Sequence, residues 1–208
     1  MKNKWFINLF LGFTKLTGII PALIFFKPRV FVSQNAKRRL PKNCILVSNH
    51  KSLLDFVLYL AIFPLRTVHF LMAEVLYNKS KFFAFLLNSW GGIKVERDER
   101  DFSFVNESIE VLDKGGSVGI FPEGTRSANG KIGRFKRGAF TIARDLHLPI
   151  IPVTISGAYN VLPKNGWYIT PGKITMTIHQ PIDTTNLNDD NLNEIIDQVK
   201  NTIESKLK

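Results

Sequence analysis

The sequence predicts an α/β fold in which a mixed, mostly parallel sheet is flanked by helices. Short apolar runs alternate with longer stretches of helical periodicity along most of the chain, and this alternation is typical of an α/β sandwich. The 208 residues are 45% hydrophobic, which is the length and composition of one domain with a sizeable core. No internal repeat or low-complexity linker indicates a second domain.

Six short runs have the length and the apolar, β-branched composition of strands. They cover residues 44–48, 68–72, 93–96, 117–121, 150–155 and 173–179. Pro152 interrupts the fifth run, and we expect that strand at a sheet edge or a bulge because proline cannot donate to a ladder. Five longer stretches show the apolar spacing of helices. They cover residues 53–63, 81–89, 102–114, 138–146 and 191–206.

Residues 1–30 form a predicted membrane-associating helical segment that precedes the folded domain at 31–208. Residues 5–26 are apolar enough to raise the alternatives of a transmembrane helix and a signal peptide. A lysine in the middle of a spanning helix costs about 2.5–3.5 kcal/mol, which argues against a span through Lys15, and no small-residue cleavage site follows. Apolar and polar residues separate onto two helical faces, which predicts an interfacial helix kinked at Pro21. Packing of this helix on the domain's own core is the alternative.

The chain is strongly basic, with a formal net charge of +11 and a pI near 9.8, so its partners are expected to be anionic. It carries no recognisable nucleic-acid-binding module, and its 17 phenylalanines suit contact with lipid or an acyl chain. Its one cysteine, Cys44, fits a core position and a reducing compartment. We therefore expect a membrane protein on the cytoplasmic face of the inner or cell membrane. Five basic residues behind the amino-terminal segment can hold anionic headgroups at about 1 kcal/mol each. They are Lys27, Arg29, Lys37, Arg38 and Arg39.

A histidine and an aspartate follow the first predicted strand at a spacing of five residues. His50 falls on the strand-to-helix loop and Asp55 in the first helical turn, so the carboxylate can lie beside one imidazole nitrogen. The other nitrogen is then free to act as a general base. The same stretch also fits a capping box in which Ser52 opens the helix and Asp55 reaches back to the cap amide. That alternative explains the spacing without any chemistry.

A glycine-containing run at residues 121–127 follows the fourth predicted strand. Gly124 permits close approach of the backbone to a ligand, and the forked guanidinium of Arg126 suits a phosphate. A solvated surface arginine is the alternative. A third run, at residues 91–97, places Arg97 after a glycine pair and a β-like stretch.

With the apolar run at 150–155, these runs resemble in order and spacing the four motif blocks of the glycerolipid acyltransferases, the family of 1-acylglycerol-3-phosphate acyltransferases. The resemblance covers residues 45–155, and Phe-Pro-Glu-Gly-Thr-Arg-Ser is its most specific part. It implies that His50 and Asp55 are catalytic and that the proline-bearing strand lines the acyl side. It also implies a set of substrate-binding residues: Arg97, Glu123, Gly124, Thr125 and Arg126. One departure is the uncharged Met72-Ala73 pair, where members of the family often carry a basic residue.

The resemblance implies transfer of an acyl chain from a thioester to the free hydroxyl of 1-acylglycerol 3-phosphate, giving phosphatidate in phospholipid biosynthesis. The donor would be acyl-coenzyme A or acyl-acyl carrier protein, with no cofactor, and the scattered histidines indicate no metal site. A basic run follows the phosphate motif and consists of Lys131, Arg134, Lys136 and Arg137. It can attract such an anionic donor, or it can be a solvated loop. Two alternatives stay open: another lysolipid acceptor, for example an amino-acid-containing one, and a non-catalytic basic membrane-binding module.

Overall fold

The computed structural model describes most of the chain. The described residues are 12, 13, 17, 23, 24, 27–37, 40–63, 68–96 and 103–207. Its strands are β1 (Arg29–Val32), β2 (Cys44–Ser48), β3 (Val68–Ala73), β4 (Gly92–Val95), β5 (Ser117–Ile120), β6 (Ile150–Ser156) and β7 (Thr175–Ile178). Its helices are α2 (Leu54–Ile62), α3 (Glu74–Tyr77), α4 (Lys81–Ser89), α5 (Ser103–Asp113), α6 (Gly138–Asp145), α7 (Ala158–Val161) and α8 (Leu192–Glu204).

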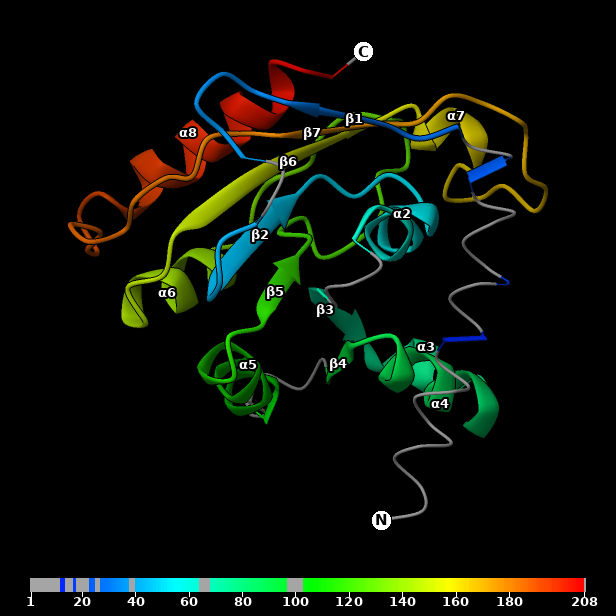
Figure 1. Ribbon diagram of the computed structural model, residues 1–208, viewed down its shortest axis with the longest axis horizontal. Coiled ribbons are helices and arrows are strands. Elements are labelled where there is room, and N and C mark those ends of the chain that lie inside the picture. The colour runs from blue at the N-terminus through cyan, green and yellow to red at the C-terminus, as the bar shows by residue number, and fades with distance from the viewer. Residues whose placement is uncertain are drawn as a thin grey trace.

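The strands form one sheet in the order β1-β7-β6-β2-β5-β3-β4. The β6–β7 pair is antiparallel and the other neighbouring pairs are parallel. This topology confirms the predicted mixed, mostly parallel sheet flanked by helices. Figure 1 shows α5, α6 and α8 on one side of the sheet and α2, α3, α4 and α7 on the other.

The core has two layers, one on each face of the sheet. Ile45 and Val47 of β2 pack in the cluster that includes residues of α5, α6 and α8, whereas Cys44 and Leu46 pack in the cluster of α2, α4 and α7. All five residues of β2 are buried, which explains why its sequence is a continuous apolar run rather than an alternating one. Cys44 is a buried core residue, as the sequence predicted.

Two neighbouring parallel strands position the site. Val47 of β2 lies in register with Ile120 of β5, so both strands reach the same edge of the sheet within a residue of each other. The loop that starts at Asn49 and the loop that starts at Phe121 therefore leave the sheet side by side, the usual place for ligands in parallel α/β sheets. The two motif runs of the sequence are these two loops.

The predicted elements agree with the structure to within a residue or two, but one local prediction is wrong, and three of the elements given above were not predicted. Pro152 does not mark an edge, because β6 lies between β7 and β2. Pro152 lies opposite His179, one residue past the end of β7, and its carbonyl accepts the N–H of His179. The N–H that Pro152 lacks would therefore point to the end of β7 and not to a residue within that strand. Strand β1 was not predicted, since it is a short edge strand without a buried face. The four-residue helices α3 and α7 are too short to show helical periodicity.

The predicted interfacial helix lies outside the described residues, except for five positions. These are Gly12, Phe13, Thr17, Leu23 and Ile24, all helical and exposed. Arg38 and Arg39 of the basic stretch also lie outside the described part. Across the residues that are described, no helix combines the length and the apolar character needed to cross a bilayer.

Candidate active site

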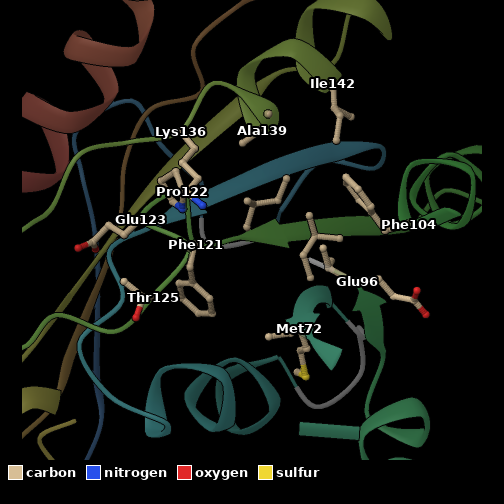
Figure 2. Close-up of a pocket in the computed structure, with 16 residues that line it drawn as sticks. Met72, Glu96, Phe104, Phe121, Pro122, Glu123, Thr125, Lys136, Ala139 and Ile142 are labelled. Atoms are coloured by element: carbon tan, nitrogen blue, oxygen red, sulfur yellow. The ribbon is translucent and has the colours of Figure 1, made fainter. Parts of the chain in front are cut away.

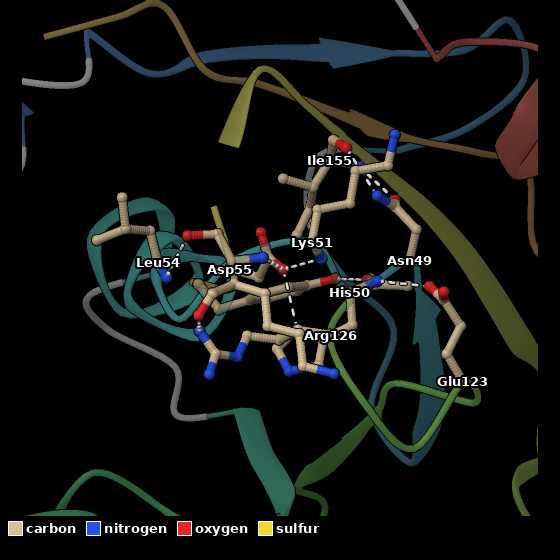
Figure 3. Close-up of polar contacts among 12 residues, drawn as sticks. Asn49, His50, Lys51, Leu54, Asp55, Glu123, Arg126 and Ile155 are labelled. Atoms are coloured by element: carbon tan, nitrogen blue, oxygen red, sulfur yellow. Dashed lines mark hydrogen bonds and ion pairs between the residues drawn. The ribbon is translucent and has the colours of Figure 1, made fainter. Parts of the chain in front are cut away.

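The His50–Asp55 pair forms as the spacing predicted. Nδ1 of His50 lies 2.9 Å from Oδ2 of Asp55, and the carboxylate is fully buried at the start of α2. The same oxygen accepts the backbone N–H groups of Lys51 at 2.7 Å and Ser52 at 2.8 Å. One oxygen of Asp55 thus bonds both the imidazole and the N–H of Ser52 that the capping interpretation predicted (Figure 3). Ser52 itself does not open α2, because the N-cap is Leu53, which makes no side-chain capping hydrogen bond.

The imidazole of His50 is held by stacking as well as by Asp55. Its ring lies 4.2 Å from the ring of Phe121 at an interplanar angle of 15°, and Phe121 in turn stacks on Phe70 of β3. The His50 side chain keeps 19% of its surface exposed. Within the described part of the chain, Nε2 of His50 has no hydrogen-bond partner, which leaves this ring nitrogen free.

Glu123 joins the two motif loops. Its Oε1 accepts the N–H of His50 and its Oε2 accepts the N–H of Gly133, both at 2.8 Å. Burial raises the pKa of the Glu123 carboxyl, and these two hydrogen bonds oppose the shift. The N–H of Ser127 adds a third contact, to the carbonyl of His50 at 2.8 Å. These bonds support the backbone of both loops.

Two neighbours of His50 were not singled out in the sequence. Asn49 makes a pair of bonds with the backbone of Ile155, from Nδ2 to the carbonyl and from the N–H to Oδ1, both at 2.8 Å. Lys51 is 8% exposed, and burial lowers its pKa against the opposing charges of Glu123 and Asp55. Their position directly beside His50 is the feature of the sequence that could have identified both residues.

The predicted phosphate-binding residues lie on the loop after β5. Nη1 of Arg126 donates to the carbonyl of Lys164 at 3.2 Å, and Nζ of Lys164 lies 3.1 Å from Oγ1 of Thr125. Lys164 was not singled out in the sequence. Gly124 has a φ of +68°, and a Cβ there would lie 3.1 Å from Nζ of Lys136, so glycine both permits the turn and leaves room for that ammonium.

Two open cavities meet at this loop. One, of about 800 Å³, is lined by largely apolar residues that include Met72, Phe104, Phe121 and Ile142 (Figure 2). The other, of about 890 Å³, is rimmed by six basic residues and one acid, Glu123. The basic residues are Arg126, Lys131, Arg134, Lys136, Arg137 and Lys164. The four basic residues noted in the sequence thus surround one hollow. The cavities share Glu123, Thr125 and Lys136.

One predicted substrate-binding residue, Arg97, lies outside the described residues. Glu96, directly before it, lines the apolar cavity and pairs with Lys94. Met72, where a basic residue was expected from the resemblance, is 8% exposed and also lines that cavity. Its Sδ lies 3.0 Å from where a Cβ on Gly92 would be.

The family model described as Acyltransferase matches residues 29–156. The chain is similar to the chloroplastic 1-acyl-sn-glycerol-3-phosphate acyltransferase BAT2 of Brassica napus, 33% identical over 147 residues, which is 67% of this chain and 40% of the relative. It is similar to the human 1-acyl-sn-glycerol-3-phosphate acyltransferase alpha, 31% identical over 160 residues, which is 76% of this chain and 56% of the relative. The chain thus spans about half the length of these curated relatives. The crystal structure of PlsC, the 1-acyl-sn-glycerophosphate acyltransferase of Thermotoga maritima, superposes with a TM-score of 0.74 at 30% identity, covering 98% of this chain and 82% of that one.

Proposed function

The chain belongs to the acyltransferase family, and we propose that it transfers an acyl chain from a thioester to the free hydroxyl of 1-acylglycerol 3-phosphate, forming phosphatidate. Its similarity to enzymes named for that acceptor supports the proposal. The observation that carries it is the His50–Asp55 pair, oriented at 2.9 Å, beside the loop that presents Thr125 and Arg126. A non-catalytic membrane-binding module would not require a buried carboxylate aligned on a histidine with one free nitrogen.

In the proposed reaction His50 acts as the general base. Its Nε2 takes the proton of the acceptor hydroxyl while that oxygen forms a bond to the thioester carbonyl carbon. The C–S bond then breaks, the thiolate leaves, and the proton on His50 can pass to the sulfur. No covalent intermediate on the protein is required, because the thioester is already activated. Asp55 stabilises the imidazolium that forms and keeps its ring in place.

The proposed acceptor site is the loop of Gly124, Thr125 and Arg126. A guanidinium and a hydroxyl can bind the phosphate together, and Lys164 and Lys136 add positive charge next to them. We propose that Arg97 contributes from the segment after β4. Glu123 instead braces the backbone on which His50 lies, through the two hydrogen bonds described above.

The proposed donor is acyl-coenzyme A or acyl-acyl carrier protein, and no cofactor takes part. Both donors are anionic, and the basic hollow of Lys131, Arg134, Lys136 and Arg137 has the charge to attract them. We further propose that residues 1–30 attach the protein to the cytoplasmic surface of the membrane from which it takes its lysolipid. Deletion of residues 1–26 should then reduce activity on bilayer substrate more than on soluble, short-chain acceptors.

The test is an acyl-transfer assay of the purified protein with a panel of lysolipids and both thioester donors. We expect phosphatidate from 1-acylglycerol 3-phosphate as the fastest product. Faster transfer to another lysolipid would move the assignment to that acceptor. Absence of transfer with every acceptor and donor would leave the non-catalytic membrane-binding module.

A further inference from the structure

The connection between α7 and β7 carries three consecutive exposed apolar residues. Trp167 is 90% exposed, Tyr168 is 62% exposed and Ile169 is 51% exposed. Tryptophan is ordinarily among the most buried residues by area, so this exposure has a cost in water. A contiguous apolar patch of this kind on a soluble surface indicates an interaction site.

The stem of this connection is held by backbone contacts, which present its tip outward. The N–H of Thr170 donates to the carbonyl of Val161 at 2.9 Å, and the N–H of Gly166 donates to that of Pro163 at 3.0 Å. Gly172 lies so close to Val161 that a Cβ there would be 2.6 Å from its Cγ2. At the tip, the rings of Trp167 and Tyr168 meet edge to face at 5.4 Å. The tip is therefore a defined apolar surface.

The chain segment that carries the tip is positively charged. The sequence has no aspartate or glutamate from residue 146 to residue 182, and Lys164 and Lys173 flank the three apolar residues. Such a surface is complementary to an anionic one. Tryptophan and tyrosine are the residues enriched at the headgroup level of bilayers, where one part of the ring system is apolar and the other is wet.

The loop is also fastened to the candidate active site. Lys164, three residues before Trp167, accepts from Arg126 through its carbonyl and donates to Thr125 through Nζ. The hydroxyl of Tyr159, on α7, donates to the carbonyl of Ala128 at 3.0 Å. A surface that binds the tip would consequently lie next to the proposed phosphate-binding loop.

We propose that residues 163–172 form a membrane-docking loop in which Trp167, Tyr168 and Ile169 enter the headgroup region of an anionic bilayer. Docking places Thr125 and Arg126 at the surface that holds the lysolipid. The loop is a separate contact from the amino-terminal segment. The link to substrate access rests on the proposed acyl transfer, whereas insertion of the loop does not.

The first test follows insertion directly. Trp5→Phe and Trp90→Phe in the full chain leave Trp167 as the only tryptophan. Phosphatidylcholine–phosphatidylglycerol vesicles with brominated acyl chains should shift its emission to the blue and quench it. Unchanged emission while the protein sediments with the vesicles would overturn the proposal. A blue shift without vesicles that grows with protein concentration would overturn it too, because a second copy would then be the occupant.

The second test compares two variants of the loop. A triple serine variant (Trp167→Ser, Tyr168→Ser, Ile169→Ser) should bind the same vesicles at least about tenfold more weakly, because it loses the apolar area that enters the interface. The matched control, Trp167→Phe with Tyr168→Phe, keeps aromatic area at both positions and should stay within about threefold of the parent. Unchanged vesicle binding by the triple variant would overturn the proposal.

The same variants test substrate access. For the triple serine variant, kcat/KM should fall about tenfold on bilayer acceptor and stay unchanged on a short-chain, soluble acceptor. Equal loss on both acceptors would overturn the loop's role in access. If the parent protein transfers no acyl chain at all, the proposed function fails, and quenching and vesicle binding still decide whether the loop inserts.

Discussion

The carboxylate of Glu123 accepts the main-chain N–H of His50 at 2.8 Å, and this bond ties the loop after β5 to the loop after β2. Because Ser127 donates to the carbonyl of the same histidine, the peptide groups on both sides of His50 are fixed by one neighbouring loop. That loop also carries Arg126. The distance between the proposed base and the proposed phosphate ligand is thus set by short contacts, and such positioning is a large part of catalysis in two-substrate reactions.

Replacing His50 with alanine should lower acyl transfer by about 10² to 10⁴-fold, which is the usual contribution of a general base. Asp55→Ala should also be severe, because the imidazole loses its partner at 2.9 Å and the loop before α2 loses the acceptor for two backbone N–H groups. The measurement is kcat/KM with phosphatidate formation followed directly.

Circular dichroism and vesicle binding serve as controls for this pair of variants. His50→Ala should leave both unchanged, whereas Asp55→Ala should lower the melting temperature. Activity of His50→Ala within about tenfold of the parent is incompatible with the proposed mechanism.

Glu123→Gln tests whether Glu123 acts as a brace. The amide can accept only through its oxygen, so one of the two N–H groups now bonded at 2.8 Å loses its acceptor. We expect a loss of about 1–3 kcal/mol in the free energy of unfolding and a fall in kcat with little change in KM for either substrate. Thermal unfolding and steady-state kinetics measure the two effects.

Glu110→Gln is the matched control, since Glu110 is exposed on α5 and pairs with Lys114, which directly follows that helix. Its stability should stay within about 0.5 kcal/mol of the parent. A rise in KM for the acceptor alone in Glu123→Gln would instead assign Glu123 to substrate binding, the role that the resemblance implied.

The sequence predicted the parts of this site that depend on local spacing. His50 and Asp55 lie within one loop and one helical turn, so their contact follows from chain geometry. The contacts of Glu123 with Gly133 and of Arg126 with Lys164 join positions 10 and 38 residues apart. Neither segment has periodicity or a motif that specifies a partner, so these contacts required the tertiary structure.

The fold shows the same division. Buried strands such as β2 were predicted because burial on both faces leaves a continuous apolar run. Strand β1 was missed because its side chains are mostly exposed and its pairing with β7 depends on a segment about 145 residues away. The prediction of an edge strand at Pro152 was wrong because the sequence shows that an N–H is missing, but not which neighbouring residue that position faces.

His179 predicts a pH dependence of stability. Thr154 donates to the carbonyl of Ile203 and therefore accepts from Nε2 of His179 at 2.8 Å, which leaves Nδ1 to accept from Ser33. Burial lowers the pKa of His179 below 6.5, and the charge of Lys206 adds to the shift. The unfolded chain then binds the proton more readily, so this stability is complete above about pH 6.5 and is lost as the pH falls toward the native pKa.

Melting temperatures from about pH 8 to about pH 5 measure this effect. His179→Gln should have a lower melting temperature than the parent at the upper end of this range. At the lower end the difference should be smaller, because protonation of His179 destabilises the parent and the variant has no histidine at this position to protonate. His147→Asn is the control, because His147 is exposed with a positive φ that asparagine tolerates. A gap between His179→Gln and the parent that does not change with pH would contradict the neutral, buried state of His179.

Arg126→Ala should weaken the use of phosphate-bearing acceptors in particular. A guanidinium facing a phosphate provides charge-assisted hydrogen bonds of about 1.5–3 kcal/mol each, and no neutral side chain replaces them. One of its N–H groups already donates to Lys164 at 3.2 Å, which holds the fork in place. Arg126→Lys should recover part of the loss, since it restores the charge but not the planar fork.

The decisive comparison is kcat/KM for lysophosphatidate beside an acceptor of the same chain length that lacks the phosphomonoester. For Arg126→Ala we expect a fall of at least tenfold on the first and little change on the second. Because Arg126 also bonds the carbonyl of Lys164, a change of loop structure would lower transfer to both acceptors equally. That equal fall, or no fall on either, would contradict the phosphate site and favour a different lysolipid as the natural acceptor.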